Sequence, residues 1–182
     1  MTTAPTAVRS AYLKDVIRQL RMFKGYVDKA LPRVPDQHLH AELDANSNSI
    51  ATIVKHVGGN LRSRYRDFLT TDGEKPDRDR DREFETTGQE SRAEILKWWD
   101  EGWSIALDAI EALTPDDLER TVRIRGEPFL VIEALNRSLA HAASHVGQIV
   151  YLSRHFAGDG WTSLTIPKGA SGEAKGVFKA ER

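Results

Sequence analysis

The chain has 182 residues, a formal net charge of -1 from 26 basic and 27 acidic side chains, and no cysteine. A chain of this size forms about one domain, and its balanced charge gives no basic field that would attract nucleic acid or an anionic membrane. Without cysteine, disulfides, thiolate ligands and a cysteine nucleophile are excluded, so any metal ligand must be nitrogen or oxygen.

The N-terminal sequence MTTAPTAVRS has no apolar centre of signal-peptide length. No stretch approaches the roughly 18 apolar residues of a membrane span. We therefore expect a cytoplasmic protein, a single domain over residues 1–182, with small-molecule or protein partners and with neither nucleic acid nor membrane among them.

Two amphipathic helices are predicted in the first half of the chain. Apolar residues recur every three or four positions over residues 7–30, and prolines follow that helix. A second helix is predicted from residue 50 to about 68, before a turn at 70–73. The segment EKPDRDRDREFE at 74–85 alternates charge sign, which is typical of a solvated loop without core residues.

Two further helices are predicted in the second half. Capping boxes place the start of the third helix within residues 87–94, and its apolar stripe ends at Leu113. A brief helical turn at 114–117 and a short extended pair around Gly126 come next. The fourth helix covers residues 131–156, with one apolar stripe and a smaller, more polar stripe that contains His141 and His145.

This pattern predicts an all-α fold: a four-helix bundle with a short extended hairpin before the last helix. The first two interhelical loops exceed ten residues each, so a crossover topology and a simple up-and-down topology both stay open. The tail at residues 158–182 is rich in glycine and lysine. We expect it to pack back on the bundle through Trp161 and then to fray.

His141 and His145 are the most informative pair, because residues four apart lie one above the other on a helix face. Small and apolar neighbours surround them in HAASHVGQIV, unlike histidines on a charged helix surface. Both rings could therefore bind one metal ion. Hydrogen-bonded groove histidines and a catalytic pair without metal are the alternatives.

His56 lies in the second helix, beside Ile53 and Asn60 on the helical wheel, where a solvent-edge residue and a metal ligand are equally compatible with the pattern. Asn60 and Gln148 are candidates for hydrogen bonds to a ligand histidine or to substrate, although both could be ordinary surface residues. The mid-helix pair Gly58–Gly59 suggests a close helix approach or a ligand near the backbone. No catalytic residue can be identified.

The segments SIATIVKHVGGNL and RGEPFLVIEALNRSLAHAASHVGQIVYLSR, together with the tail WTSLTIPKGAS, resemble an uncharacterised bacterial branch of the DinB-like (damage-inducible) metalloprotein superfamily. The resemblance spans nearly the whole chain. It implies a four-helix bundle, a homodimer and a divalent metal held by three histidines, which correspond here to His56, His141 and His145. Better-known relatives are metal-dependent transferases or isomerases that use bacillithiol, mycothiol or glutathione.

Three functions are compatible with these observations. The first is a thiol-dependent S-transferase that acts on small electrophiles at an open three-histidine site. The second is a metal-dependent hydrolase, which is weaker because no carboxylate shares the histidine stripe. The third is a non-enzymatic, metal-stabilised dimeric binding module. Imidazole ligands suit Zn, Ni, Fe or Mn, so the sequence does not name the metal, and it carries no motif for a thiol cofactor.

Overall fold

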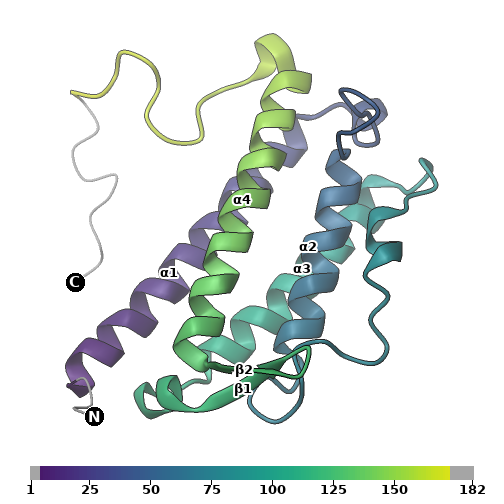
Figure 1. Cartoon of the computed structure of the whole chain (residues 1–182). Helices are drawn as coiled ribbons and strands as arrows, with labels where there is room; N and C mark the ends of the chain where they lie inside the picture. Colours follow the sequence, from purple (N-terminus) through teal and green to yellow (C-terminus); the bar gives the residue numbers. More distant parts are fainter. Residues whose placement is uncertain (1–4, 173–182) are drawn as a thin grey trace.

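Four α-helices and one two-stranded hairpin form most of the structure, a computed structural model that describes residues 5–172 (Figure 1). The elements are α1 (Thr6–Ala30), α2 (Ile50–Tyr65), α3 (Arg92–Glu111), β1 (Thr121–Ile124), β2 (Glu127–Leu130) and α4 (Val131–Ala157). These bounds confirm the four predicted helices and the predicted hairpin. The helical turn expected after α3 is also present, at Pro115–Glu119.

The helix ends follow local chemistry. Ser49 caps α2 by accepting a hydrogen bond from the backbone N–H of Thr52 at 3.2 Å, and Ser91 and Glu94 form a capping box at the start of α3. The prediction that α2 continues to residue 68 is wrong by three residues. The backbone turns into an extended conformation at Arg66 and a left-handed one at Asp67 (φ 51°), although Phe68 is still buried.

The helices are arranged as two layers, with α1 beside α4 and α2 beside α3. In Figure 1, α1 and α4 run upward whereas α2 and α3 both run downward. The long connection between α2 and α3 therefore crosses back over the length of the molecule. This arrangement is consistent with the predicted four-helix bundle, in the crossover form that the loop lengths left open.

Helices α2 and α3 approach closely because glycines face each other. A Cβ atom on Gly58 would lie 2.3 Å from the carbonyl oxygen of Trp98, and one on Gly102 would lie 2.6 Å from the Cα of Gly58. No side chain can occupy either position without moving backbone. The close helix approach suggested by Gly58 is thus confirmed.

The core is formed by the apolar stripes of all four helices. Its largest fully buried side chains include Trp99 and Trp103, whose rings pack against each other with centroids 5.3 Å apart. The indole N–H of Trp99 donates to Asp28 Oδ1 at 2.9 Å, so the buried polar atom has a partner from α1. The tryptophan core thereby ties α3 to α1.

The hairpin closes the lower end of the molecule in Figure 1. Its strands pair antiparallel through a two-residue turn in which Arg125 (φ 57°) and Gly126 (φ 79°) are both left-handed. Asp72, in the connection after α2, accepts hydrogen bonds from both of these turn N–H groups, at 2.8 and 2.7 Å. The connection therefore fixes the hairpin turn in place.

The prediction that residues 74–85 form a solvated loop without core residues is wrong in part. Lys75 and Glu83 are buried, with 6% of each residue exposed, and Glu83 lies in a short 3₁₀-helix at Asp81–Phe84. A pattern search for apolar periodicity does not detect a charged side chain that is buried because it has charged partners. Glu74 is half-buried, and the remaining acidic residues of this segment, Asp77, Asp79, Asp81 and Glu85, are exposed, as predicted.

The tail returns to the bundle through Trp161, as predicted. Its ring is half-buried and lies 5.3 Å from the guanidinium carbon of Arg33, which also donates to the carbonyl oxygen of Thr162. Part of the predicted fraying concerns residues 173–182, which lie outside the described residues.

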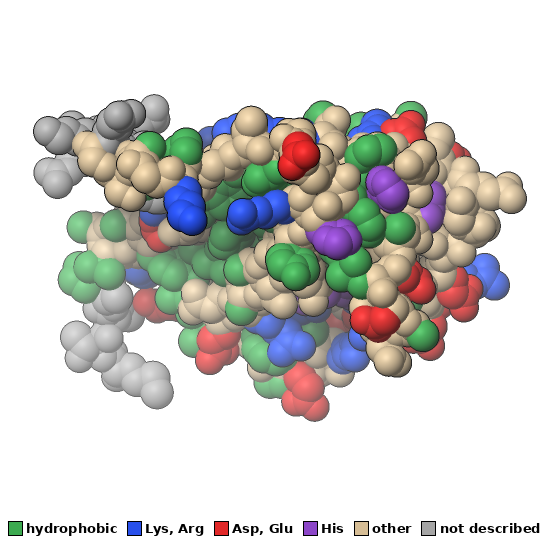
Figure 2. All heavy atoms as spheres, turned by 90° about the horizontal axis from the view of Figure 1, so that it is seen from above, with side chains coloured by type: hydrophobic (Ala, Val, Ile, Leu, Met, Phe, Trp, Pro, Cys, Tyr) green, Lys and Arg blue, Asp and Glu red, His purple; other side chains and the backbone are tan. Residues whose placement is uncertain are grey.

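The surface carries both signs of charge. Figure 2 looks onto the end of the molecule where α4 finishes, and its acidic and basic side chains are scattered with histidines and uncharged groups between them. Within residues 5–172, no helix combines the length and the apolar character needed to cross a bilayer.

Candidate metal centre

Three histidines from two helices converge between α2 and α4. His56 comes from α2, and His141 and His145 come from successive turns of α4. One ring nitrogen of each lies within 4.8 Å of the corresponding atoms of the other two. The Nε2 atoms of His56 and His141 are 3.2 Å apart. These three residues are close enough to hold a single metal ion.

Hydrogen bonds to the Nδ1 atoms orient two of the three rings. His56 Nδ1 donates to Glu83 Oε2 at 2.9 Å, and His145 Nδ1 donates to Gln148 Oε1 at 2.9 Å. A proton on Nδ1 leaves the lone pair on Nε2, which in His56 is the atom nearest to His141. Hydrogen bonds of this kind orient ligand histidines in metal proteins.

The two imidazoles of α4 are also in the protonation state that a metal requires. Burial, as the largest cause, and the neighbouring His145 and His56 rings together lower the pKa of His141 to about 3. Burial also lowers the pKa of His145, although its hydrogen bond with Gln148 opposes this shift. At neutral pH these two rings are therefore uncharged and able to coordinate.

The observed spacing fits a metal of ordinary bond length. With metal–nitrogen bonds of 2.0–2.1 Å, two ligands of a tetrahedral ion lie about 3.3 Å apart. The Nε2 atoms of His56 and His141 are separated by 3.2 Å, close to that value. All three ligand nitrogens lie within 4.8 Å of one another. The residues present therefore fit a divalent ion with three nitrogen ligands.

Glu83 belongs to a buried ion-pair network and is not a free carboxylate. Arg78 donates to both of its oxygens, from Nε at 2.7 Å and from Nη2 at 2.8 Å, and to Glu74 from Nη1 at 2.8 Å. Burial alone raises the pKa of Glu83, but the hydrogen bonds from Arg78 and His56 outweigh it and lower the pKa. Glu83 therefore stays ionised and oriented toward His56.

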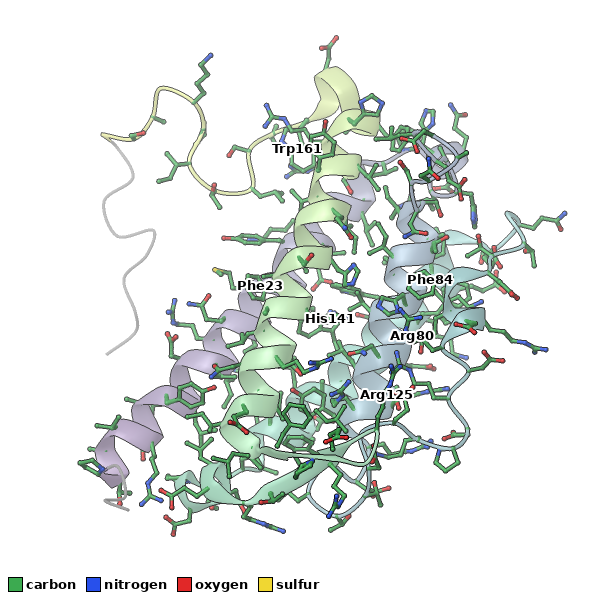
Figure 3. All side chains as sticks on the ribbon, viewed as in Figure 1. Phe23, Arg80, Phe84, Arg125, His141 and Trp161 are labelled. Atoms are coloured by element: carbon green, nitrogen blue, oxygen red, sulfur yellow. The ribbon has the colours of Figure 1, made fainter. Side chains whose placement is uncertain are left out.

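A cavity of about 370 Å³ opens beside the three imidazoles. Phe84 covers part of it and packs on His56 with ring centroids 4.5 Å apart, and Ile124 of the hairpin and Asn60 also line it. In Figure 3, Phe84 and Arg80, from the segment that follows α2, and Arg125, from the hairpin turn, all lie on the same side of His141. The site is therefore a pocket with room for a small molecule next to the imidazoles.

The other predicted site residues have distinct positions. His56 is buried, with 4% of the residue exposed, so the solvent-edge alternative for it is wrong. Gln148 contacts His145, and Asn60 lines the cavity. The remaining histidines lie elsewhere: His38 stacks on Phe156, His40 contacts the carbonyl oxygen of Glu90, and His155 is exposed.

Sequence reasoning missed Glu83 and the arginines of the cavity. Arg78 and Glu83 are part of the alternating-charge segment, and nothing in that pattern separates a buried ion pair from a solvated one. For two of the arginines, the helical spacing from the histidines could have indicated a place near the site. Arg64 lies two turns after His56 on the same face of α2, and Arg137 lies one turn before His141 on α4.

Comparison with known proteins gives a family and no activity. No curated protein is similar enough to this chain to count as a match. The family that does match covers residues 7–170, which includes every residue of the site described above. The chain therefore belongs to the family DUF1572, described as a protein of unknown function.

Proposed function

We propose that this protein binds a divalent transition-metal ion, such as Zn, Ni, Fe or Mn, through His56, His141 and His145, and that it is a thiol-dependent S-transferase for small electrophiles. The observation that carries this proposal is the convergence of three imidazoles on the wall of a cavity. Three nitrogen ligands leave a coordination position open for a reactant. A bound ion would supply Lewis acidity that favours the deprotonated form of a nucleophile.

The surrounding residues have defined roles in this proposal. Glu83 and Gln148 hold the rings of His56 and His145 in the tautomer that directs a lone pair away from the hydrogen bond. Phe84 and Ile124 provide apolar walls that exclude water from one side of the cavity. The DinB-like assignment and a homodimeric state remain part of the proposal and rest on the sequence resemblance.

A metal titration followed by an activity assay tests this function. Metal-free protein is titrated with each candidate metal, and the loaded protein is then incubated with bacillithiol, mycothiol or glutathione and an electrophile such as chlorodinitrobenzene. We expect stoichiometric metal binding and metal-dependent loss of the free thiol. His141→Ala should lose both, whereas His155→Ala, which changes an exposed histidine of the same helix, should keep both. Thiol consumption no faster than with His141→Ala would exclude the transferase.

A metal-dependent hydrolase has less support. It needs a general base near the reactant, and no aspartate or glutamate lines the cavity in the part of the chain that the structure describes. Both oxygens of Glu83, the nearest candidate, already accept hydrogen bonds from Arg78 and His56. Metal-dependent turnover in a panel of esters, amides and phosphoesters would restore this alternative.

One observation favours a non-enzymatic role as the second candidate. The three histidines come from α2 and α4, so an ion bound by them would join these two helices and contribute to folding. In that case removal of the metal would lower the melting temperature, and no thiol or electrophile would be consumed. The same two measurements therefore separate the transferase from a metal-stabilised module.

A further inference from the structure

The cavity beside the imidazoles is strongly basic. Five arginines line it: Arg64, Arg78, Arg80, Arg125 and Arg137. No acidic residue among residues 5–172 lines it with them. Glu74 pairs with Arg78 and, at 3.3 Å, with Arg125, and Glu83 pairs with Arg78. Asp81 lies 3.7 Å from Arg80. Among the described residues, these three carboxylates offset the charge of Arg78, Arg80 and Arg125 and leave that of Arg64 and Arg137 uncompensated.

Arg64 is the most informative of the five. Only 7% of the residue is exposed, and its Nε atom is buried without a hydrogen-bond partner. Burial lowers the pKa of the Arg64 guanidinium, and the positive charges of Arg137 and Arg78 lower it further. A buried guanidinium that lacks a counter-ion is costly. An anion in the cavity would remove that cost.

Among residues 5–172, Arg137 has no carboxylate partner either. The ion pairs of the cavity arginines involve Arg78, Arg80 and Arg125, and none found within residues 5–172 involves Arg64 or Arg137. The contact recorded for Arg137 is with the ring of Phe129, 5.9 Å from its guanidinium carbon. Its side chain is thus free of competing negative charge.

The helix register places these two arginines at one end of the cavity and the imidazoles at the other. Arg137 is one turn before His141 on α4, which corresponds to about 6 Å along the axis. Arg64 is two turns after His56 on α2, and α2 and α4 run in opposite directions. Both guanidiniums therefore lie on the hairpin side of the histidines.

We infer that the cavity binds a small molecule through a carboxylate or phosphate group, which Arg64 and Arg137 hold while the rest of the molecule extends toward the three imidazoles. Guanidinium groups suit this role because their paired N–H donors match the geometry of both oxyanions. The inference deepens the proposed function, on which it rests for the reacting end of the ligand. It favours thiols with carboxylates, glutathione and bacillithiol, over mycothiol, which has none.

Calorimetric titration of the metal-free protein tests the anion site independently of any metal. The probes are inorganic phosphate, succinate and, as a neutral analogue of succinate, succinamide, all at constant pH and ionic strength. Chelator is removed beforehand by dialysis, because its own carboxylates would compete. We expect phosphate or succinate to bind and succinamide not to bind. The probe that binds more tightly identifies the preferred oxyanion.

Arg137→Gln should weaken binding of that probe by about tenfold or more, since it removes a charged hydrogen-bond donor. Arg154→Gln changes an exposed arginine of the same helix outside the cavity and should leave the affinity unchanged. Because Arg137 is exposed, its substitution should not disturb folding. Circular dichroism of the variant checks this.

Three results would overturn the inference: no binding of either anion at millimolar concentration, equal binding of succinamide, or equal affinity in wild type and Arg137→Gln. Metal binding is measured separately with His56→Ala. Absence of metal binding by the wild-type protein, or equal metal binding by wild type and His56→Ala, with intact anion binding would refute only the proposed metal function. Metal binding by the wild-type protein without anion binding would refute only the anion site.

Discussion

Among the single residues of the candidate site, His141 is the one whose protonation the fold affects most clearly. Its ring is partly buried beside two other imidazoles and two arginines, so the charged form is unfavourable in the folded state. The same environment that keeps the ring available to a metal therefore makes the folded state sensitive to acid.

The metal-free protein should lose stability as the pH falls below about 6.5. The pKa of His141 drops from 6.5 to about 3 on folding, so between these values the unfolded chain binds a proton that the folded chain does not. Stability therefore decreases with decreasing pH throughout this window. Urea unfolding at several pH values between 7.5 and 4 should show a steeper decline for wild type than for His141→Ala. If the stability of both proteins decreased equally with pH, the pKa of His141 would not be lowered in the folded state.

Glu83 should matter for metal affinity although it does not line the cavity. Glu83→Gln removes the negative charge that accepts the hydrogen bond from His56 Nδ1, and it also removes the charged partner of Arg78. Loss of such an orienting carboxylate typically weakens metal binding by about 10–100-fold. A competition titration with a chromogenic chelator measures this change. Glu85→Gln, an exposed neighbour in the same segment, should bind metal like wild type.

The predictability of the site differs from residue to residue. The spacing of His141 and His145 showed that their rings share a helix face, because helical periodicity is a local property. The position of His56 depended on how α2 packs against α4, and only the resemblance assigned it to the same group. Glu83 could not be predicted at all. Its partner His56 is 27 positions away in the sequence, and Arg78, five positions before it, is one of several alternating charges that look alike in the sequence.

At the level of elements, the contact between α2 and α3 depends on the absence of side chains at Gly58 and Gly102. Gly58→Ala should destabilise the protein by about 1–3 kcal/mol, because the new methyl group meets the rigid backbone of Trp98. Gly147→Ala is the matched control: this exposed glycine of α4 has no atom within 4 Å of an added Cβ. It should raise stability by up to about 1 kcal/mol through helix propensity.

Chemical denaturation of the three proteins measures both effects. Similar stability of Gly58→Ala and wild type would mean that α2 and α3 can separate without cost, and the close packing described here would be wrong.

The elements themselves were largely predictable, whereas their connections were not. Apolar stripes and capping boxes placed all four helices, and Gly126 marked the hairpin turn. The crossover between α2 and α3 could not be chosen from loop length, because a long loop permits both topologies. The anchoring of the hairpin turn by Asp72 was equally hidden, since it joins residues more than 50 positions apart.

At the scale of the whole molecule, the candidate site lies where the two layers meet. His56 belongs to the layer of α2 and α3, and the other two histidines belong to the layer of α1 and α4. An ion bound by all three would therefore link the layers, in addition to any role in chemistry. This linkage makes thermal stability a direct readout of metal binding.

Metal should raise the melting temperature by several degrees. An ion that binds only the folded state stabilises it by about 2.7 kcal/mol when its free concentration is 100 times its dissociation constant. In a chain of this size, each kcal/mol shifts the melting temperature by about 2–4 °C, so the expected rise is about 5–10 °C. Addition of chelator should reverse this rise.

His56→Ala provides the decisive control for this measurement, because it removes the ligand of one layer and leaves both histidines of α4. Its melting temperature should respond little to metal, since two ligands from a single helix cannot link the layers. His40→Ala changes a histidine that contacts Glu90 instead of the site, so its melting temperature should rise with metal like that of wild type. If metal stabilises His56→Ala as much as wild type, the ion binds elsewhere, and the three imidazoles do not form the metal centre.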